Sequence, residues 1–92
     1  MKIDVYTQPM CQPCRLVKQM FEDAGLEEDV DYQVTDISRS DLGRQRVLGL
    51  GLTSVPVITA GSRVIQGVSN PDEIRDLIDE YLESDKDGRW LH

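Results

Sequence analysis

The chain has 92 residues, which is enough for one small domain with a modest hydrophobic core but not for two domains. Its 17 acidic and 10 basic residues give a net charge of −7 without a cluster of Lys and Arg, so we expect no nucleic-acid partner. Hydrophobic residues make up 39% of the chain, and no apolar run approaches the ~20 residues that cross a bilayer. A membrane-spanning protein is therefore excluded.

The start of the chain and its cysteine content indicate a compartment. The first five residues carry one Lys and an Asp within the short apolar stretch, which is not the pattern of a secretory signal. The chain has two cysteines and none left over for a framework of structural bridges. We therefore expect a cytoplasmic location. Separately, we expect the protein to be a monomer. The acidic excess is interpreted as an aid to solubility, with docking onto a basic patch of a larger enzyme as the alternative.

The first half of the chain alternates between strand and helix patterns. Residues 3–6 are rich in β-formers and predict a buried strand. Apolar residues then recur at three- and four-residue spacing from Leu16 to Ala24, which predicts a helix over about 12–24 that ends before Gly25. Residues 30–36 alternate apolar and polar side chains and predict a second strand.

The second helix and a hairpin follow. The polar segment 38–41 is typical of a helix start, and the helix ends at the glycines Gly49 and Gly51. Its expected apolar stripe is thin and consists of Leu42, Val47, Leu48 and Leu50. Residues 57–59 and 63–66 are two short apolar segments joined by a turn that contains Gly61, so they predict a hairpin.

The last helix has the clearest start signal. Asn70 is expected to cap it, Pro71 takes the first helical position, and Glu73 is placed to reach back to the cap. Its apolar face consists of Ile74, Leu77, Ile78, Tyr81 and Leu82. The order β-α-β-α-β-β-α predicts an α/β domain over residues 1–83, with a four-stranded mixed sheet flanked by three helices on both faces. Residues 84–92 are polar and without periodicity, so we expect a mobile tail, with docking by Trp90 as an alternative.

The two cysteines form a Cys-X-X-Cys motif, Cys11 to Cys14, between the first strand and the first helix. Two thiols at this spacing can form a disulfide when the second lies in the first helical turn, and the helix start favours a thiolate on the first. Cys11 is therefore the expected nucleophile and Cys14 the thiol that resolves the mixed disulfide. Pro13 removes one amide donor but stiffens the motif, so its net effect on the thiolate is open. A metal site lacks ligands, because the only histidine is His92.

These features resemble a known family. The passage 5–11, the segment 48–50 before Ser54-Val55-Pro56, and the stretch 67–72 are similar to the thioredoxin-fold glutaredoxins, and in particular to the redoxins of the NrdH type that serve ribonucleotide reductase. The resemblance covers residues 3 to about 82. The chain departs from the NrdH pattern where that family has aromatic residues around Gly67 and an arginine before the following proline. Here Val68 and Asn70 stand at two of those places.

The resemblance implies a substrate groove beside Cys11. Pro56 would be a cis-proline that exposes the backbone of Val55 to an extended substrate segment. The other residues assigned to the groove are Thr7, Met10, Gln12, Pro13, Gly67 and Val68. For Thr7, Met10 and Val68 simple packing is an equal alternative. Arg15 and Lys18 either stabilise the thiolate or belong to a solvated helix face.

Three functions remain open. The first, implied by the resemblance, is an electron carrier that thioredoxin reductase reduces and that passes electrons to ribonucleotide reductase or a similar disulfide protein. No cofactor would be bound, since NADPH acts only through the separate reductase. The second is a glutathione-dependent glutaredoxin, although Gln8 and the stretch 67–70 offer poor grips for the tripeptide. The third is a binding domain of the same fold without catalysis.

Overall fold

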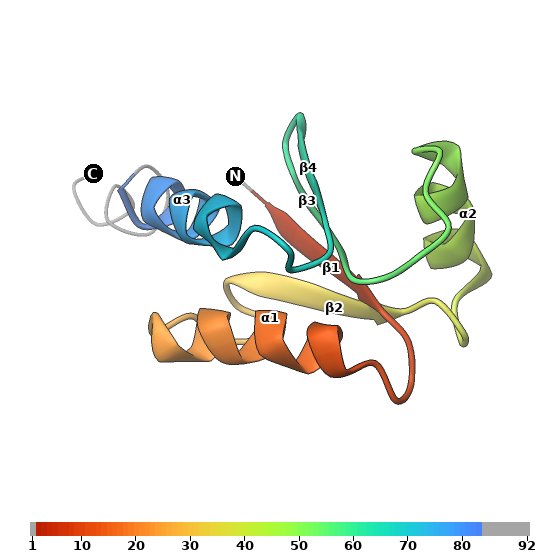
Figure 1. Ribbon diagram of the computed structural model, residues 1–92, viewed down its shortest axis with the longest axis horizontal. Coiled ribbons are helices and arrows are strands. Elements are labelled where there is room, and N and C mark those ends of the chain that lie inside the picture. Colours follow the sequence, from red (N-terminus) through yellow and green to blue (C-terminus); the bar gives the residue numbers. More distant parts are fainter. Residues whose placement is uncertain (1, 84–92) are drawn as a thin grey trace.

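The computed structural model describes residues 2–83, so the expected tail and the role of Trp90 lie outside the described residues. Seven elements follow one another in the expected order: β1 (Ile3–Thr7), α1 (Gln12–Asp23), β2 (Tyr32–Asp36), α2 (Asp41–Gly49), β3 (Val57–Ala60), β4 (Arg63–Gln66) and α3 (Pro71–Tyr81). Within the described part of the chain, no helix has the length and apolar character needed to cross a bilayer. The arrangement is a thioredoxin-like fold (Figure 1).

The four strands form one mixed sheet in the order β2-β1-β3-β4. β1 runs parallel to β2, with Ile3 opposite Tyr32, and antiparallel to β3, with Tyr6 opposite Val57. β3 and β4 form the predicted hairpin, in which Val57 lies opposite Gln66. The end of β1, the start of β3 and the end of β4 therefore meet at one edge of the sheet. The cysteine motif leaves β1 at this edge.

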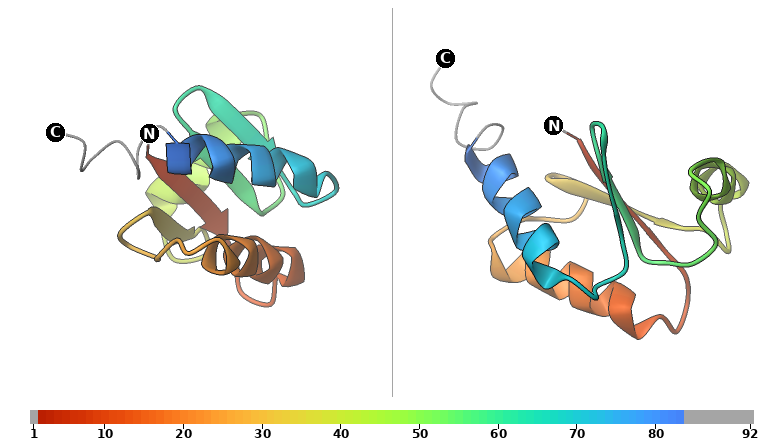
Figure 2. Two further views of the ribbon diagram at one scale, coloured as in Figure 1. Left: turned by 90° about the vertical axis from the view of Figure 1, so that its left-hand side faces the viewer. Right: turned by 45° about the horizontal axis from the view of Figure 1, so that its top comes forward.

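The helices cover the two faces of the sheet unequally, as Figure 1 and Figure 2 show. α1 and α3 pack on one face over the main core, because alternate strand residues such as Ile3, Val5 and Ile58 point toward that face. The helices contribute the buried side chains of Val17, Phe21, Ile74, Leu77, Ile78 and Tyr81. α2 lies alone on the other face, where Tyr6, Val47 and Val57 form a much smaller cluster.

The second strand, predicted to begin at residue 30, begins two residues later in the structure. β2 starts at Tyr32, and Val30 is 64% exposed. Asp29 has a positive φ of 68°, which bends the chain out of a strand path. The carboxylate of the buried Asp31 accepts the Glu27 backbone N–H at 2.7 Å and the Tyr81 hydroxyl at 2.8 Å. These bonds hold the segment before β2 as a loop against the end of α3.

The helix starts confirm two predictions and correct one. Ser40 caps α2, since its hydroxyl oxygen accepts the backbone N–H of Gly43 at 3.0 Å. α3 begins at Pro71 as expected. Asn70 occupies the cap position, but its side chain makes no capping hydrogen bond; instead its backbone carbonyl accepts the Glu73 N–H at 3.1 Å. The rigid φ of proline therefore starts this helix without a side-chain cap.

The expected stripe of α2 is not a buried face. Val47 is buried, whereas Leu42, Leu48 and Leu50 are exposed. Besides Val47, the helix buries only Gly43. Gly43 lies close to β2, since a Cβ built on it would be 2.6 Å from Cγ2 of Thr35. α2 therefore contacts the sheet by a narrow strip.

Candidate active site

The cysteine motif is held between β1 and α1 by local backbone geometry. The chain reverses at Met10, which has a positive φ of 59°, and Cys11 is the extended N-cap residue of α1. Its Sγ accepts the backbone N–H of Cys14 at 3.2 Å. Pro13 lies in the first turn, where its missing N–H costs no helical hydrogen bond. The amide of Cys14 thus supplies the sulfur contact that Pro13 cannot.

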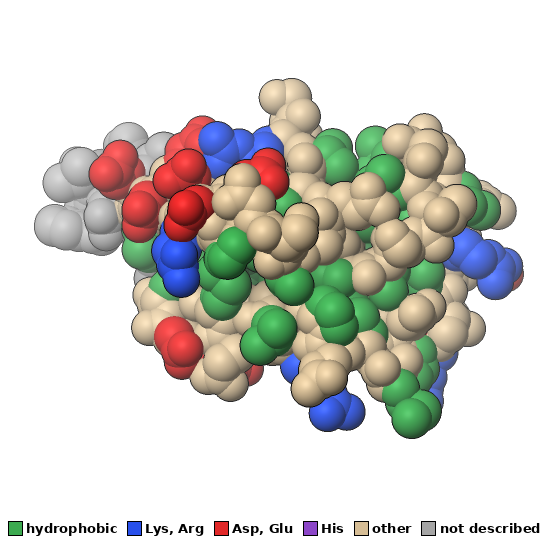
Figure 3. All heavy atoms as spheres, in the orientation of Figure 1, with side chains coloured by type: hydrophobic (Ala, Val, Ile, Leu, Met, Phe, Trp, Pro, Cys, Tyr) green, Lys and Arg blue, Asp and Glu red, His purple; other side chains and the backbone are tan. Residues whose placement is uncertain are grey.

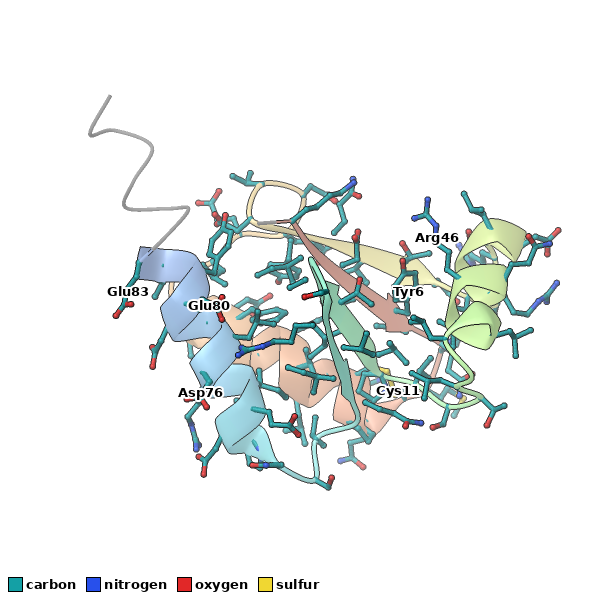
Figure 4. All side chains as sticks on the ribbon, turned by 90° about the horizontal axis from the view of Figure 1, so that it is seen from above. Tyr6, Cys11, Arg46, Asp76, Glu80 and Glu83 are labelled. Atoms are coloured by element: carbon teal, nitrogen blue, oxygen red, sulfur yellow. A yellow bond between two sulfur atoms is a disulfide. The ribbon has the colours of Figure 1, made fainter. Side chains whose placement is uncertain are left out.

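The two sulfur atoms are joined in a disulfide, with the Cα atoms 5.3 Å apart. The two cysteines differ in accessibility, because Cys14 is 3% exposed and Cys11 only half-buried. Figure 4 shows the labelled Cys11 at the first turn of α1, with the yellow sulfur bond beside it. The positive end of the helix dipole faces Cys11, and this favours the thiolate over the thiol when the pair is reduced.

The other predicted groove residues fall into three groups around the motif. Thr7 and Met10 line a cavity of about 210 Å³ together with both cysteines. The remaining lining residues are Gln8, Pro9, Arg15, Lys18 and Val34. Arg15 and Lys18 therefore line the same cavity as the cysteines, which the helical pattern alone did not predict. The sequence did not predict Val34 as a residue of the site, because its place in the lining depends on the pairing of β2 with β1.

The second group lies on the loops at the same sheet edge. The Val55–Pro56 peptide bond is cis, as the resemblance implied. The Gly67 N–H donates to the Pro56 carbonyl at 2.8 Å, and the Gln66 side-chain amide donates to Ser54 Oγ at 2.7 Å. These bonds join the segment before β3 to the segment after β4. Pro56 itself is fully buried and Val55 partly buried.

Val68, Gln12 and Pro13 occupy different surroundings. Val68 packs against the main core, in line with the packing alternative, although it follows Gly67 on the same loop. Gln12 and Pro13 are exposed at the first turn of α1, beside Cys11. The structure thus brings Thr7, Met10 and the cysteines to one cavity and leaves the cis-proline loop outside its lining.

The charges near the site have distinct partners. Lys18 pairs with Glu28 at 3.3 Å. Asp36 lies at the end of β2, opposite Thr7 in the register. The hydroxyl and the backbone N–H of Ser38 both donate to Asp36, and they hold the pKa of this carboxyl below its usual value, with a smaller contribution from Arg39. Asp36 is therefore a carboxylate at neutral pH.

Residues 2–83 contain no group of three or more His, Cys, Asp or Glu side chains that could hold a metal ion.

The sequence of this chain is similar to those of known proteins. A family model described as Glutaredoxin matches residues 3–65. The chain is 40% identical over 85 residues to the Gene 56 protein of Mycobacterium phage D29, covering 90% of this chain and 89% of the relative.

Two solved structures share the fold. The glutaredoxin-like NrdH-redoxin of Escherichia coli has a TM-score of 0.73 and 26% identity, over 84% of this chain and 95% of its own. The thioredoxin-like protein BC3987 has a TM-score of 0.71 and 28% identity, over 82% and 97% of the two chains. The family match spans more than half of this chain and includes both cysteines. The chain therefore belongs to the glutaredoxin family, as a thiol-disulfide oxidoreductase whose redox-active pair is Cys11 and Cys14.

Proposed function

We propose that this protein carries electrons from a thioredoxin reductase to a disulfide of another protein, either ribonucleotide reductase or a similar disulfide protein. The observation that carries the mechanism is the unequal exposure of the two cysteines. An incoming disulfide can meet the sulfur of Cys11, whereas Cys14 is shielded. Cys11 is therefore the attacking residue and Cys14 the resolving one.

The reaction proceeds by two exchanges. The Cys11 thiolate attacks one sulfur of the substrate disulfide, the new Cys11–substrate bond forms, and the substrate's second sulfur leaves with the electron pair and takes a proton. The Cys14 thiol then loses its proton to solvent, and the resulting thiolate attacks the sulfur of Cys11. The first substrate sulfur leaves with the electron pair and takes a proton, so it is released as a thiol. The substrate gains two electrons and two protons, and the protein is left with the Cys11–Cys14 disulfide.

The choice of reductase is supported by the likeness to NrdH-redoxin of Escherichia coli, which is described as a glutaredoxin-like protein with a thioredoxin-like activity profile. A reductase of this class would return two electrons from NADPH to the Cys11–Cys14 disulfide. The protein itself would then need no bound cofactor.

The test follows NADPH consumption during reduction of a protein disulfide. One reaction contains thioredoxin reductase, the other contains glutathione and glutathione reductase, and Cys11→Ser serves as the control in both. We expect turnover with thioredoxin reductase, no turnover with the variant, and reduction of oxidised ribonucleotide reductase in the same system. Turnover with glutathione alone would contradict the proposal and identify a glutathione-dependent glutaredoxin.

A further inference from the structure

We propose that the cavity beside the disulfide is a subsite for a carboxylate side chain of the substrate, and that Arg15 selects substrates with an acidic residue next to the reacting cysteine. This inference rests on the proposed function, since it concerns the segment that becomes joined to Cys11. The cavity measures about 210 Å³ and both cysteines line it. A group that enters it therefore belongs to a residue close to the substrate cysteine.

The cavity is large enough for a side chain. Its volume exceeds the roughly 150 Å³ of an engineered protein cavity that accepts a benzene ring. Its lining combines neutral residues with two cations and includes no Asp or Glu. A substrate carboxylate that enters it therefore meets no like charge in the lining, and it finds Arg15 and Lys18 at the border.

The two cations differ in availability. Lys18 is already paired with Glu28 at 3.3 Å. Arg15 is exposed and has no ion-pair partner among residues 2–83. By contrast, Arg39, Arg44, Arg63 and Arg75 each lie within 4 Å of a carboxylate. Among residues 2–83, Arg15 is thus the cation of the cavity lining that has no ion-pair partner. The planar donors of its guanidinium suit a carboxylate.

The negative charge of the rest of the molecule opposes the binding of an acidic peptide. A preference for acidic peptides would therefore point to contacts within the cavity. The net charge is −7, and Figure 3 shows carboxylates gathered over α3 at the left of the view. In Figure 4 the labelled Asp76 lies on α3 and the labelled Glu83 just beyond its end, and both are well away from Cys11. The long-range field of the protein therefore repels acidic peptides. A faster reaction with an acidic peptide has to come from local contacts at the site.

The experiment measures the first exchange alone. Three short peptides carry one cysteine flanked on both sides by glutamate, glutamine or lysine, and each cysteine is linked to thionitrobenzoate. When Cys11 of the fully reduced protein attacks the peptide sulfur, the bond to thionitrobenzoate breaks and the coloured thiolate leaves with the electron pair. Its absorbance gives the rate constant of this step. The variants are Arg15→Gln and Arg46→Gln.

Arg46 is the matched control because it is also an arginine without an ion-pair partner in the described range, and it lies on α2. Both substitutions change the net charge equally. We expect the glutamate peptide to react roughly two- to fivefold faster than the glutamine peptide, as an exposed ion pair allows. The lysine peptide reports the opposite effect of the long-range field, which attracts cations. Arg15→Gln is expected to bring the glutamate-to-glutamine ratio to about one, whereas Arg46→Gln keeps it.

The outcomes separate this inference from the proposed function. Equal rates for the glutamate and glutamine peptides, or a ratio that Arg15→Gln and Arg46→Gln lower alike, would overturn the carboxylate subsite and leave the exchange reaction in place. Failure of all three peptides to release thionitrobenzoate would overturn both, because Cys11 would then not be the attacking residue.

Discussion

Two glycines of α2 allow the packing of this helix on the sheet to be tested by one chemical change. A Cβ on Gly43 would lie 2.6 Å from Cγ2 of Thr35 and 3.2 Å from Oγ of Ser40, the capping atom of the helix. A Cβ on Gly49 would have no heavy atom within 4 Å. Gly43→Ala and Gly49→Ala therefore add the same methyl group to the same helix in opposite surroundings.

The expected free energies of unfolding follow from two opposing effects. Replacing glycine by alanine within a helix favours folding by about 0.4–1 kcal/mol, and this gain applies to both variants. Overpacking costs about 1–3 kcal/mol, and it applies only to Gly43→Ala, because the methyl of the β-branched Thr35 has little freedom to move. The structure thus predicts a net loss of up to about 2.6 kcal/mol for Gly43→Ala and no loss for Gly49→Ala.

Urea unfolding followed by far-UV circular dichroism measures both values, since a domain of this size is expected to unfold in two states. The double variant Gly43→Ala/Thr35→Ser keeps the hydroxyl of residue 35 and removes its methyl group. It is expected to recover most of the loss relative to Thr35→Ser alone. If Gly43→Ala proves as stable as Gly49→Ala, the close approach of α2 to β2 is wrong.

Three further predictions concern other contacts. Tyr81→Phe removes the 2.8 Å hydrogen bond to the buried carboxylate of Asp31 and is expected to cost about 1.5–3 kcal/mol in urea unfolding; a loss below the error of the method would show that this bond contributes nothing. Burial, helped by nearby carboxylates, raises the pKa of Tyr32, so the folded chain keeps this proton where the unfolded chain loses it. Stability should therefore decline as the pH rises above about 10, and Tyr32→Phe should reduce this decline in unfolding curves measured across that range. Cys14→Ser should trap the substrate on Cys11 as a mixed disulfide visible by mass spectrometry, and rapid release of the substrate from this variant would contradict the resolving role of Cys14.

The order of elements was predictable because each carried its own local signal. Pro71 marked the start of α3, Gly61 marked the hairpin turn, and the spacing of apolar residues marked α1. The cysteine pair was predictable for the same reason, since its chemistry follows from the motif and its position before a helix. The cis peptide before Pro56 came from family resemblance, because no local pattern distinguishes it.

The remaining features depend on contacts between distant segments. Alternation alone suggested a strand at Val30, but the buried Asp31 bonds to Tyr81, which lies 50 residues further along the chain. The same holds for Arg15, whose place beside the cavity depends on how α1 docks next to β1 and β2. Leu42 and Leu48 looked like a buried stripe because hydrophobicity does not reveal how much partner surface is available to a helix.

The position of β1 between β2 and β3 has a consequence for hydrogen exchange. Its backbone amides are bonded on both sides, so they can exchange with solvent only when the sheet itself opens. α2 buries only Gly43 and Val47, so its amides can exchange through a local opening of much lower free energy. The cysteine motif continues directly from β1 into α1, and no residue of α2 lines the cavity that contains both cysteines. We therefore expect the redox centre to keep its geometry when α2 opens transiently.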